Sequence, residues 1–267
     1  MERELRFESP SFTKRLKGML GVDFYRLFHT PMFYIFLAIA AIIPALIMGT
    51  TGPENAMYTN AWQCIAADTP LYVVSNMGEY ANMNMVFIFG GIMVSIFIGN
   101  DYRSGYVKQL FTTHAKKQDY MMSKTITCAF AMACMCVTYL IGGIAAGLLV
   151  GMSFEANMGS VIIAVLSKMI MSLGWASLYT FLNVIFRKYF GISIASSFFF
   201  GTGILIIGAA AVLGNNSVLN IFLYGSSVYA CLSSTPVTLL VCFVVSAVWA
   251  VIYNVLGTHL LSKSDVY

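Results

Sequence analysis

Apolar residues in this chain gather into six long segments, which polar stretches separate. About 20 helical residues cross the hydrocarbon core of a bilayer, and each segment is close to that length. The pattern therefore predicts an all-α polytopic membrane protein with six transmembrane helices. The expected spans are residues 32–49, 83–99, 124–151, 160–186, 191–213 and 237–261.

A different pattern precedes the first span. Apolar residues recur at helical spacing along one broad face, at Phe12, Leu16, Met19, Leu20, Phe24, Leu27 and Phe28. Asp23 interrupts that face, and Thr30-Pro31 breaks the helix before the membrane. We expect an interfacial elbow helix whose basic side meets anionic head groups, with a helix packed on protein as the alternative. The basic side carries Lys14, Arg15, Gly18 and Arg26.

The basic residues indicate an orientation. Of the 15 lysines and arginines, 14 lie before the first span, after the second, after the fourth or after the sixth. Because cytoplasmic loops carry the excess of Lys and Arg, both termini are expected in the cytoplasm. Residues 1–31 and 262–267 would then flank a membrane domain of residues 32–261. The three remaining loops hold no Lys or Arg, but they contain Glu54, Asp68, Glu79 and Glu155.

Composition agrees with this reading. Hydrophobic residues make up 59% of the chain and charged residues 10%, whereas soluble domains have about 25% charged residues. Six spans in 267 residues leave no room for a separate soluble domain. The basic residues are scattered and lack base-stacking aromatic neighbours, so nucleic acid is not an expected partner.

The last outer segment, residues 214–236, carries no charge. Two short apolar stretches, residues 218–224 and 228–232, stand on either side of Gly225-Ser226-Ser227. We expect two half-helices that dip into the outer leaflet, where irregular backbone is tolerated only against protein or a cavity. A plain extracellular loop is the alternative. A disulfide between Cys64 and Cys231, both in outer loops, also stays open.

Glycines four residues apart mark the third span, at Gly143, Gly147 and Gly151. Small residues at this spacing form a groove where a neighbouring backbone can approach closely. We interpret them as a helix-packing face.

The fourth span contains the one basic residue that is out of place. Lys168 lies eight residues into the span from its outer end. A charged amine in lipid costs from about 3 to over 10 kcal/mol, so Lys168 should face protein or a wet cavity. A structural ion pair with Glu155 or Glu79, or a side chain that snorkels outward, is the alternative to a translocation path. The other candidates on the same side of the helix are Ser172, Trp175, Tyr179 and Asn183.

Motifs for catalysis and metal binding are missing from the sequence. There is no Gly-Lys dipeptide for a phosphate-binding loop and no His-Glu-x-x-His. Cys134-x-Cys136 lacks the usual zinc spacing. Proton- or sodium-coupled carriers usually have membrane carboxylates, and the six spans have none. A translocation domain driven by another protein is therefore favoured over a secondary transporter, a channel or a membrane-embedded enzyme.

The loop between the second and third spans carries a motif that resembles the ABC-2 family of ABC transporter permeases. Tyr106 stands where that family usually has Thr, and His114 roughly where it has Pro. The elbow helix, the six spans and the cytoplasmic termini are also similar to that family. The matching positions are Asp101-Tyr102, Gly105, Lys108, Leu110, Lys116, Tyr120 and Lys124.

The resemblance implies a dimer with the same or a homologous permease, bound to two cytosolic ABC ATPase subunits. ATP and Mg²⁺ would be held by those ATPases, and this chain would need no cofactor of its own. Size and layout are similar to bacterial drug-resistance and lantibiotic or bacitracin immunity exporters of the cytoplasmic membrane, and sodium-efflux permeases are similar too. Residues 104–118 are expected to form a short cytoplasmic coupling helix. The residues that the resemblance assigns to ATPase coupling are Asp101, Tyr102, Arg103, Gly105, Tyr106, Lys108, Leu110 and Phe111.

Overall fold

The computed structural model describes residues 11–51, 60–65, 83–112, 115–155, 157–205, 217–232 and 235–263. Every regular element in these ranges is a helix, which confirms the all-α class. The elements are α1 (Phe12–His29), α2 (Pro31–Thr51), α3 (Ala61–Ile65), α4 (Met85–Arg103), α5 (Tyr106–Thr112), α6 (Lys117–Val150), α7 (Met158–Ile185), α8 (Phe190–Gly201), the 3₁₀ helix η2 (Ser217–Ile221), α10 (Leu223–Leu232) and α11 (Pro236–Lys263).

Four of the described helices, α4, α6, α7 and α11, are each long and apolar enough to cross a membrane. α1 and α2, the latter as far as Leu46, reach this length and apolar character only as a pair, and a bend of 65° separates the two helices. The bend falls at Thr30-Pro31, where the sequence predicts a break. The fifth expected span is described as far as residue 205, and its last residues, 206–213, lie outside the described part of the chain.

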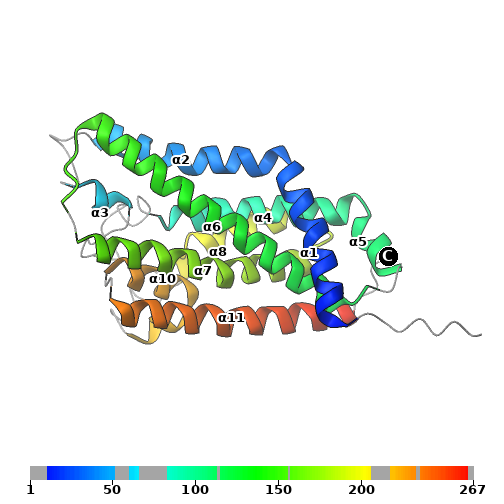
Figure 1. The fold of residues 1–267 in the computed structure, drawn as a ribbon. Helices are drawn as coiled ribbons and strands as arrows, with labels where there is room; N and C mark the ends of the chain where they lie inside the picture. The colour runs from blue at the N-terminus through cyan, green and yellow to red at the C-terminus, as the bar shows by residue number, and fades with distance from the viewer. Residues whose placement is uncertain are drawn as a thin grey trace, which may run out of the picture.

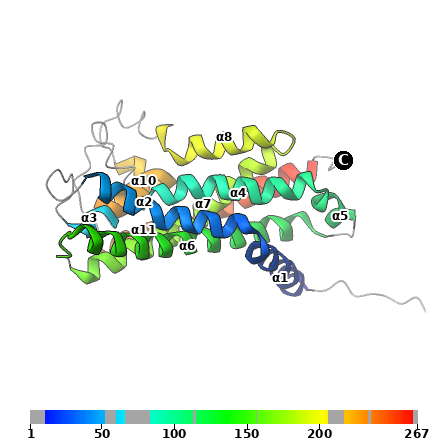
Figure 2. The ribbon, with the colours of Figure 1, turned by 90° about the horizontal axis from the view of Figure 1, so that it is seen from above.

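The helices form a bundle with α7 at its centre. The neighbours of α7 are α4, α6, α8, α10 and α11, while α2 packs on α6 and α8 packs on α4. We call one end of the bundle the basal end, because α1, α5 and the C-terminal end of α11 lie there (Figure 1). α3 lies at the opposite end, and α8 covers one face beside α4 (Figure 2).

The glycines of α6 allow two neighbouring segments to approach closely. A Cβ added to Gly142 would lie 2.1 Å from the carbonyl oxygen of Ala41, so α2 meets α6 in backbone contact there. Gly143 and Gly147 are similarly close to side chains of α3. Gly151 was predicted to pack in the same way, and this is wrong. It has φ of 77° and ends α6 as a left-handed cap, with open space where a Cβ would be.

The segment before α11 is helical, but the expected break at Gly225-Ser226-Ser227 is wrong. α10 runs through these residues, and the chain changes from η2 to α10 at Phe222 instead. The Ser227 hydroxyl donates to the carbonyl of Leu223 at 2.8 Å, one turn back. A Cβ on Gly225 would lie 2.0 Å from the carbonyl oxygen of Leu219, so glycine here lets η2 fold closely against α10.

This segment also extends to about the middle of α11. The Trp249 indole donates to the carbonyl of Ile221 at 2.8 Å. Trp249 is 13 residues into α11, which at 1.5 Å per residue is about 20 Å along that helix. η2 and α10 therefore lie beside the half of α11 that is farther from the basal end, where Leu223 and Tyr224 of α10 are buried and Val218 and Ile221 of η2 are exposed. Half-helices that dip into the outer leaflet stay a prediction. The side chains of Cys64 and Cys231 lie outside the described part.

Candidate functional site

Four charged side chains join α1, α4 and α6 at the basal end. We call them the basal cluster: Asp23 and Arg26 of α1, Asp101 of α4 and Lys124 of α6. Asp23, Asp101 and Lys124 are at most 1% exposed, and the Arg26 side chain is 28% exposed. Charges this deeply buried must be compensated by partners, because taking a lone ion out of water costs several kcal/mol.

Lys124 is the centre of the basal cluster. Its Nζ lies 2.5 Å from Asp23 Oδ1 and 2.6 Å from Asp101 Oδ2. Arg26 donates to the other oxygen of Asp101, and the Ser123 hydroxyl donates to Asp23 Oδ2 at 2.6 Å. Two carboxylates thus face two cations, so the cluster has no net charge. Burial lowers the pKa of the Arg26 guanidinium, but Asp101 and Asp23 outweigh this effect and leave that pKa raised.

These contacts correct the expected orientation of α1. Arg15 and Arg26 were predicted to face lipid head groups, but Arg15 Nε lies 2.7 Å from Asp119 Oδ2 and Arg26 binds Asp101. Asp23, which interrupts the apolar face, points inward with that face and meets Lys124. Among the described residues of α1, Asp23 and Leu27 are the buried ones. The first helix is therefore fixed to α4 and α6 by charge as well as by apolar packing.

The expected short helix after the second span is present as α5. Gly105 has φ of 72°, a left-handed conformation that glycine adopts without strain, and it forms the turn from α4 into α5. Tyr106 then places its ring 4.3 Å from the guanidinium carbon of Arg26, and Val107 is buried. α5 is thus attached directly to the basal cluster.

The residues assigned to ATPase coupling divide into buried and exposed groups. Asp101 is fully buried, and Tyr102, Leu110 and Phe111 are half-buried against a small apolar group around Val107. Arg103 and Lys108 are exposed, and so are Gln109 and Thr112, which the sequence did not single out. The outward surface of α5 is therefore polar, while its aromatic and aliphatic residues pack on the chain itself.

The polar residues of α7 lie in the protein interior. Lys168 is 1% exposed and donates to the amide oxygen of Asn84 and, at 2.5 Å, to the carbonyl of Ser227. Ser227 also accepts from the Trp175 indole at 3.0 Å. Lys168 therefore connects α7 to the start of α4 and to α10. Of its two predicted ion partners, Glu155 is exposed, and Glu79 lies outside the described residues.

The remaining stripe residues are also hydrogen-bonded and buried. The Ser172 hydroxyl donates to the carbonyl of Lys168 at 3.1 Å, and the Tyr179 hydroxyl donates to the carbonyl of Phe87 at 2.8 Å. Trp175 stacks between Phe87 and Tyr179, with ring centroids 5.4 and 5.6 Å away. In this arrangement the stripe holds the helices together, and a path along it requires α4 and α7 to separate.

Asn183, at the basal end of the stripe, belongs to a polar network that the sequence did not reveal. Its amide nitrogen donates to the Ser95 hydroxyl at 3.1 Å, and its amide oxygen accepts from the Ser193 hydroxyl. Ser95 in turn donates to the Ser197 hydroxyl at 2.7 Å. Small hydroxyl residues commonly join membrane helices in this way. The only available signal was the presence of serines within apolar segments.

Most of this arrangement lies within a region that matches a known protein family. Residues 20–203 match the model of the ABC-2 family transporter proteins, which is more than half of the chain. The chain belongs to the ABC-2 transporter family. No curated protein matches it. As an ABC-2 protein it is a multi-pass membrane permease subunit of an ABC transporter, and this family associates with ABC ATPases.

The matched region of this ABC-2 permease contains the whole basal cluster, α5 and the α7 stripe, and it ends before η2. The motif residues Asp101 and Lys124 are therefore internal supports of the permease base, each buried and paired. Gly105 is required by the turn into α5. These parts of the motif have a structural reason that does not depend on direct contact with another subunit.

Proposed function

We propose that this chain is the permease subunit of an ATP-driven exporter, which moves an amphipathic substrate out of or away from the membrane. The substrate class would be an antimicrobial peptide, a drug or a lipid. The permease would work as a dimer with the same or a homologous chain and with two ATPase subunits. Both termini and the basal end would face the cytoplasm of a bacterial cell.

The attachment of α5 is the observation that carries this proposal. α5 is joined to α4 by the turn at Gly105, and its Tyr106 ring lies against Arg26 of the basal cluster, which links α1 and α6. A displacement of α5 by an ATPase would therefore act on the ends of α1, α4 and α6 together. A short helix held in this way is suited to transmit motion into the bundle.

The buried carboxylates support an ATP-driven mechanism over an ion-coupled carrier. Those that the structure describes are Asp23, Asp101 and Asp119, and each contacts a lysine or an arginine. All three lie at the basal end. Carriers coupled to protons or sodium usually keep a carboxylate within the membrane to bind the ion. These three carboxylates are instead used to hold α1 against the bundle.

The exposed surface of α5 provides the test. Gln109→Glu with Thr112→Glu changes two exposed positions without touching the packed side of the helix. The expected result is that a coexpressed ABC ATPase no longer copurifies in mild detergent, while the permease keeps its melting temperature. Leu110 and Phe111 are unsuitable for this purpose, because they pack against the base and their replacement would also damage the fold.

The matched control is Ser11→Glu with Thr13→Glu, which adds the same two negative charges at exposed positions at the start of α1. The control should retain the ATPase. If the α5 double variant also retained the ATPase and transported normally, the ATPase contact would lie elsewhere and the proposal for α5 would be wrong.

A further inference from the structure

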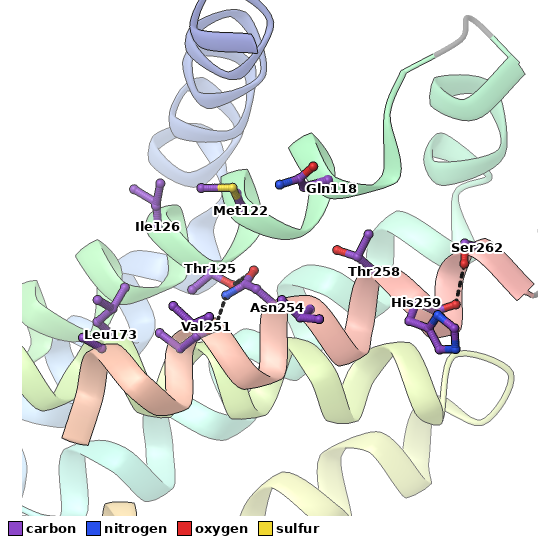
Figure 3. A pocket seen from close by; sticks show the side chains of 13 residues that line it. Gln118, Met122, Thr125, Ile126, Leu173, Val251, Asn254, Thr258, His259 and Ser262 are labelled. Carbon is purple, nitrogen blue, oxygen red and sulfur yellow. Dashed lines mark hydrogen bonds between the residues drawn. The ribbon is translucent and has the colours of Figure 1, made fainter. Parts of the chain in front are cut away.

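A long groove lies between α6 and α11 in the basal half of the bundle. Its volume is about 800 Å³, and side chains of both helices line it (Figure 3). It extends along α11 from Ser262 to Ala247, which is 15 residues or about 22 Å. Half of a bilayer, head groups included, is also about 20–22 Å thick. The groove is thus as long as one leaflet.

The groove changes in polarity along its length. At the basal end it is lined by Gln118, His259 and Ser262, whereas its inner end is lined by Leu173 and Val251. Within a membrane this order matches an amphiphile whose polar end is at the surface and whose chain points to the midplane. The groove would hold such a molecule with its polarity matched along the full length.

Thr125 and Asn254 contribute polar groups between these two ends. The Thr125 hydroxyl donates to the amide oxygen of Asn254 at 3.1 Å, and the Asn254 amide donates to the carbonyl of Ala250 at 2.8 Å. Asn254 lies eight residues from Ser262, which is about 12 Å along the helix. These two residues place polar groups partway between the polar end of the groove and its apolar end.

The mouth of the groove is positively charged. Lys117 places its Nζ 2.6 Å from the carbonyl of Leu261, next to the groove residue Ser262. Lys116 and Lys263 are exposed at the same end. Asp119, the acidic residue nearest to Lys117 in the sequence, is buried and paired with Arg15. It therefore does not offset the charge of Lys117 at the mouth. The charge at the mouth therefore favours an anionic head group.

We propose that the groove between α6 and α11 binds one anionic phospholipid of the leaflet at the basal end. Its phosphate lies near Gln118, His259 and Ser262, and one acyl chain follows the groove toward Leu173 and Val251. The proposal requires that α6 and α11 cross the bilayer. It does not depend on the direction of transport or on the identity of the exported substrate.

The test is native mass spectrometry of the purified permease incubated with phosphatidylglycerol or, separately, with phosphatidylcholine. We expect one phosphatidylglycerol per chain to be retained under conditions that remove phosphatidylcholine. Val251→Trp should abolish this retention by filling the groove. Val244→Trp is the matched control, because Val244 is exposed on the same helix but lies beyond the groove.

Charge is tested separately with Lys117→Gln and Lys263→Gln. Each lysine near an anionic surface is worth about a fivefold change in binding, so the preference for phosphatidylglycerol should fall about 25-fold in the double variant. Lys108→Gln, on the exposed surface of α5, should leave it unchanged. Equal retention of the two lipids, or full retention in Val251→Trp, would overturn the proposal. Conversion of a dimer to a monomer by Val251→Trp would also overturn it, since the groove would then be an interface between copies.

Discussion

Removing the shared cation of the basal cluster should destabilise the whole permease. Lys124→Met is close in size to the original side chain, but it leaves the carboxylates of Asp23 and Asp101 facing each other with Arg26 as their one cationic partner in the basal cluster. Removing one member of a buried ion pair costs about 3–5 kcal/mol. At about 2–4 °C per kcal/mol for a chain of this size, the melting temperature should fall by about 6–20 °C.

The comparison with two further variants separates charge balance from other effects. Asp101→Asn combined with Lys124→Met removes one charge of each sign, so the double variant should be more stable than the sum of the two single changes predicts. Lys108→Met deletes an exposed lysine of α5, and we expect an effect within about 0.5 kcal/mol.

Thermal unfolding in detergent, followed by a thiol-reactive dye, is a suitable assay because Cys128, Cys136 and Cys242 are buried. All variants should be heated at one scan rate, since unfolding of membrane proteins is commonly irreversible and the apparent midpoint then depends on the rate. A Lys124→Met permease that melts within about 2 °C of the original chain would refute the role of the basal cluster, since this shift corresponds to less than about 1 kcal/mol.

Three other predictions follow from separate parts of the structure. Cysteine at Glu155 should react with an impermeant thiol reagent outside intact cells and cysteine at Gln118 should not; the reverse labelling would invert the orientation. Lys168→Met removes the donor to two buried oxygens, and each oxygen left without a donor costs about 1–3 kcal/mol. The melting temperature and transport should therefore fall together. Lost transport at normal stability would instead place Lys168 on the translocation path. Gly142→Ala should destabilise by about 1–3 kcal/mol through its clash with α2, whereas Gly18→Ala, in open space, should be neutral or stabilising in the same melting assay.

The spans and the short helix α5 could be predicted because their signals are local. A long apolar run is enough to specify a spanning helix, and α4, α6, α7 and α11 coincide with predicted spans. The turn at Gly105 and the helix α5 follow from a contiguous motif. Such features need no knowledge of which helix lies beside which, so a single sequence contains the necessary information.

The basal cluster could not be derived in this way. Asp23 and Lys124 are 101 positions apart, and no periodicity relates them. The one indication was an acidic residue within the apolar face of α1. Without knowledge of its partner, that residue can only be interpreted as an interruption of the face. The course of α10 was missed for a related reason. Gly225-Ser226-Ser227 resembles a break, but contacts with Leu219 and Leu223 stabilise a helix there.

The wide sequence separation within the basal cluster has a consequence for biosynthesis. Asp23 and Arg26 are translated long before their partners Asp101 and Lys124. At about 5–20 residues per second, Asp23 leaves the peptidyl-transfer centre about 5–20 s before Lys124. Two expected spans are translated during that interval, while α1 carries charges whose later partners do not yet exist and must remain in contact with water. The first helix of the chain therefore cannot reach its final position until the start of the third span has been made.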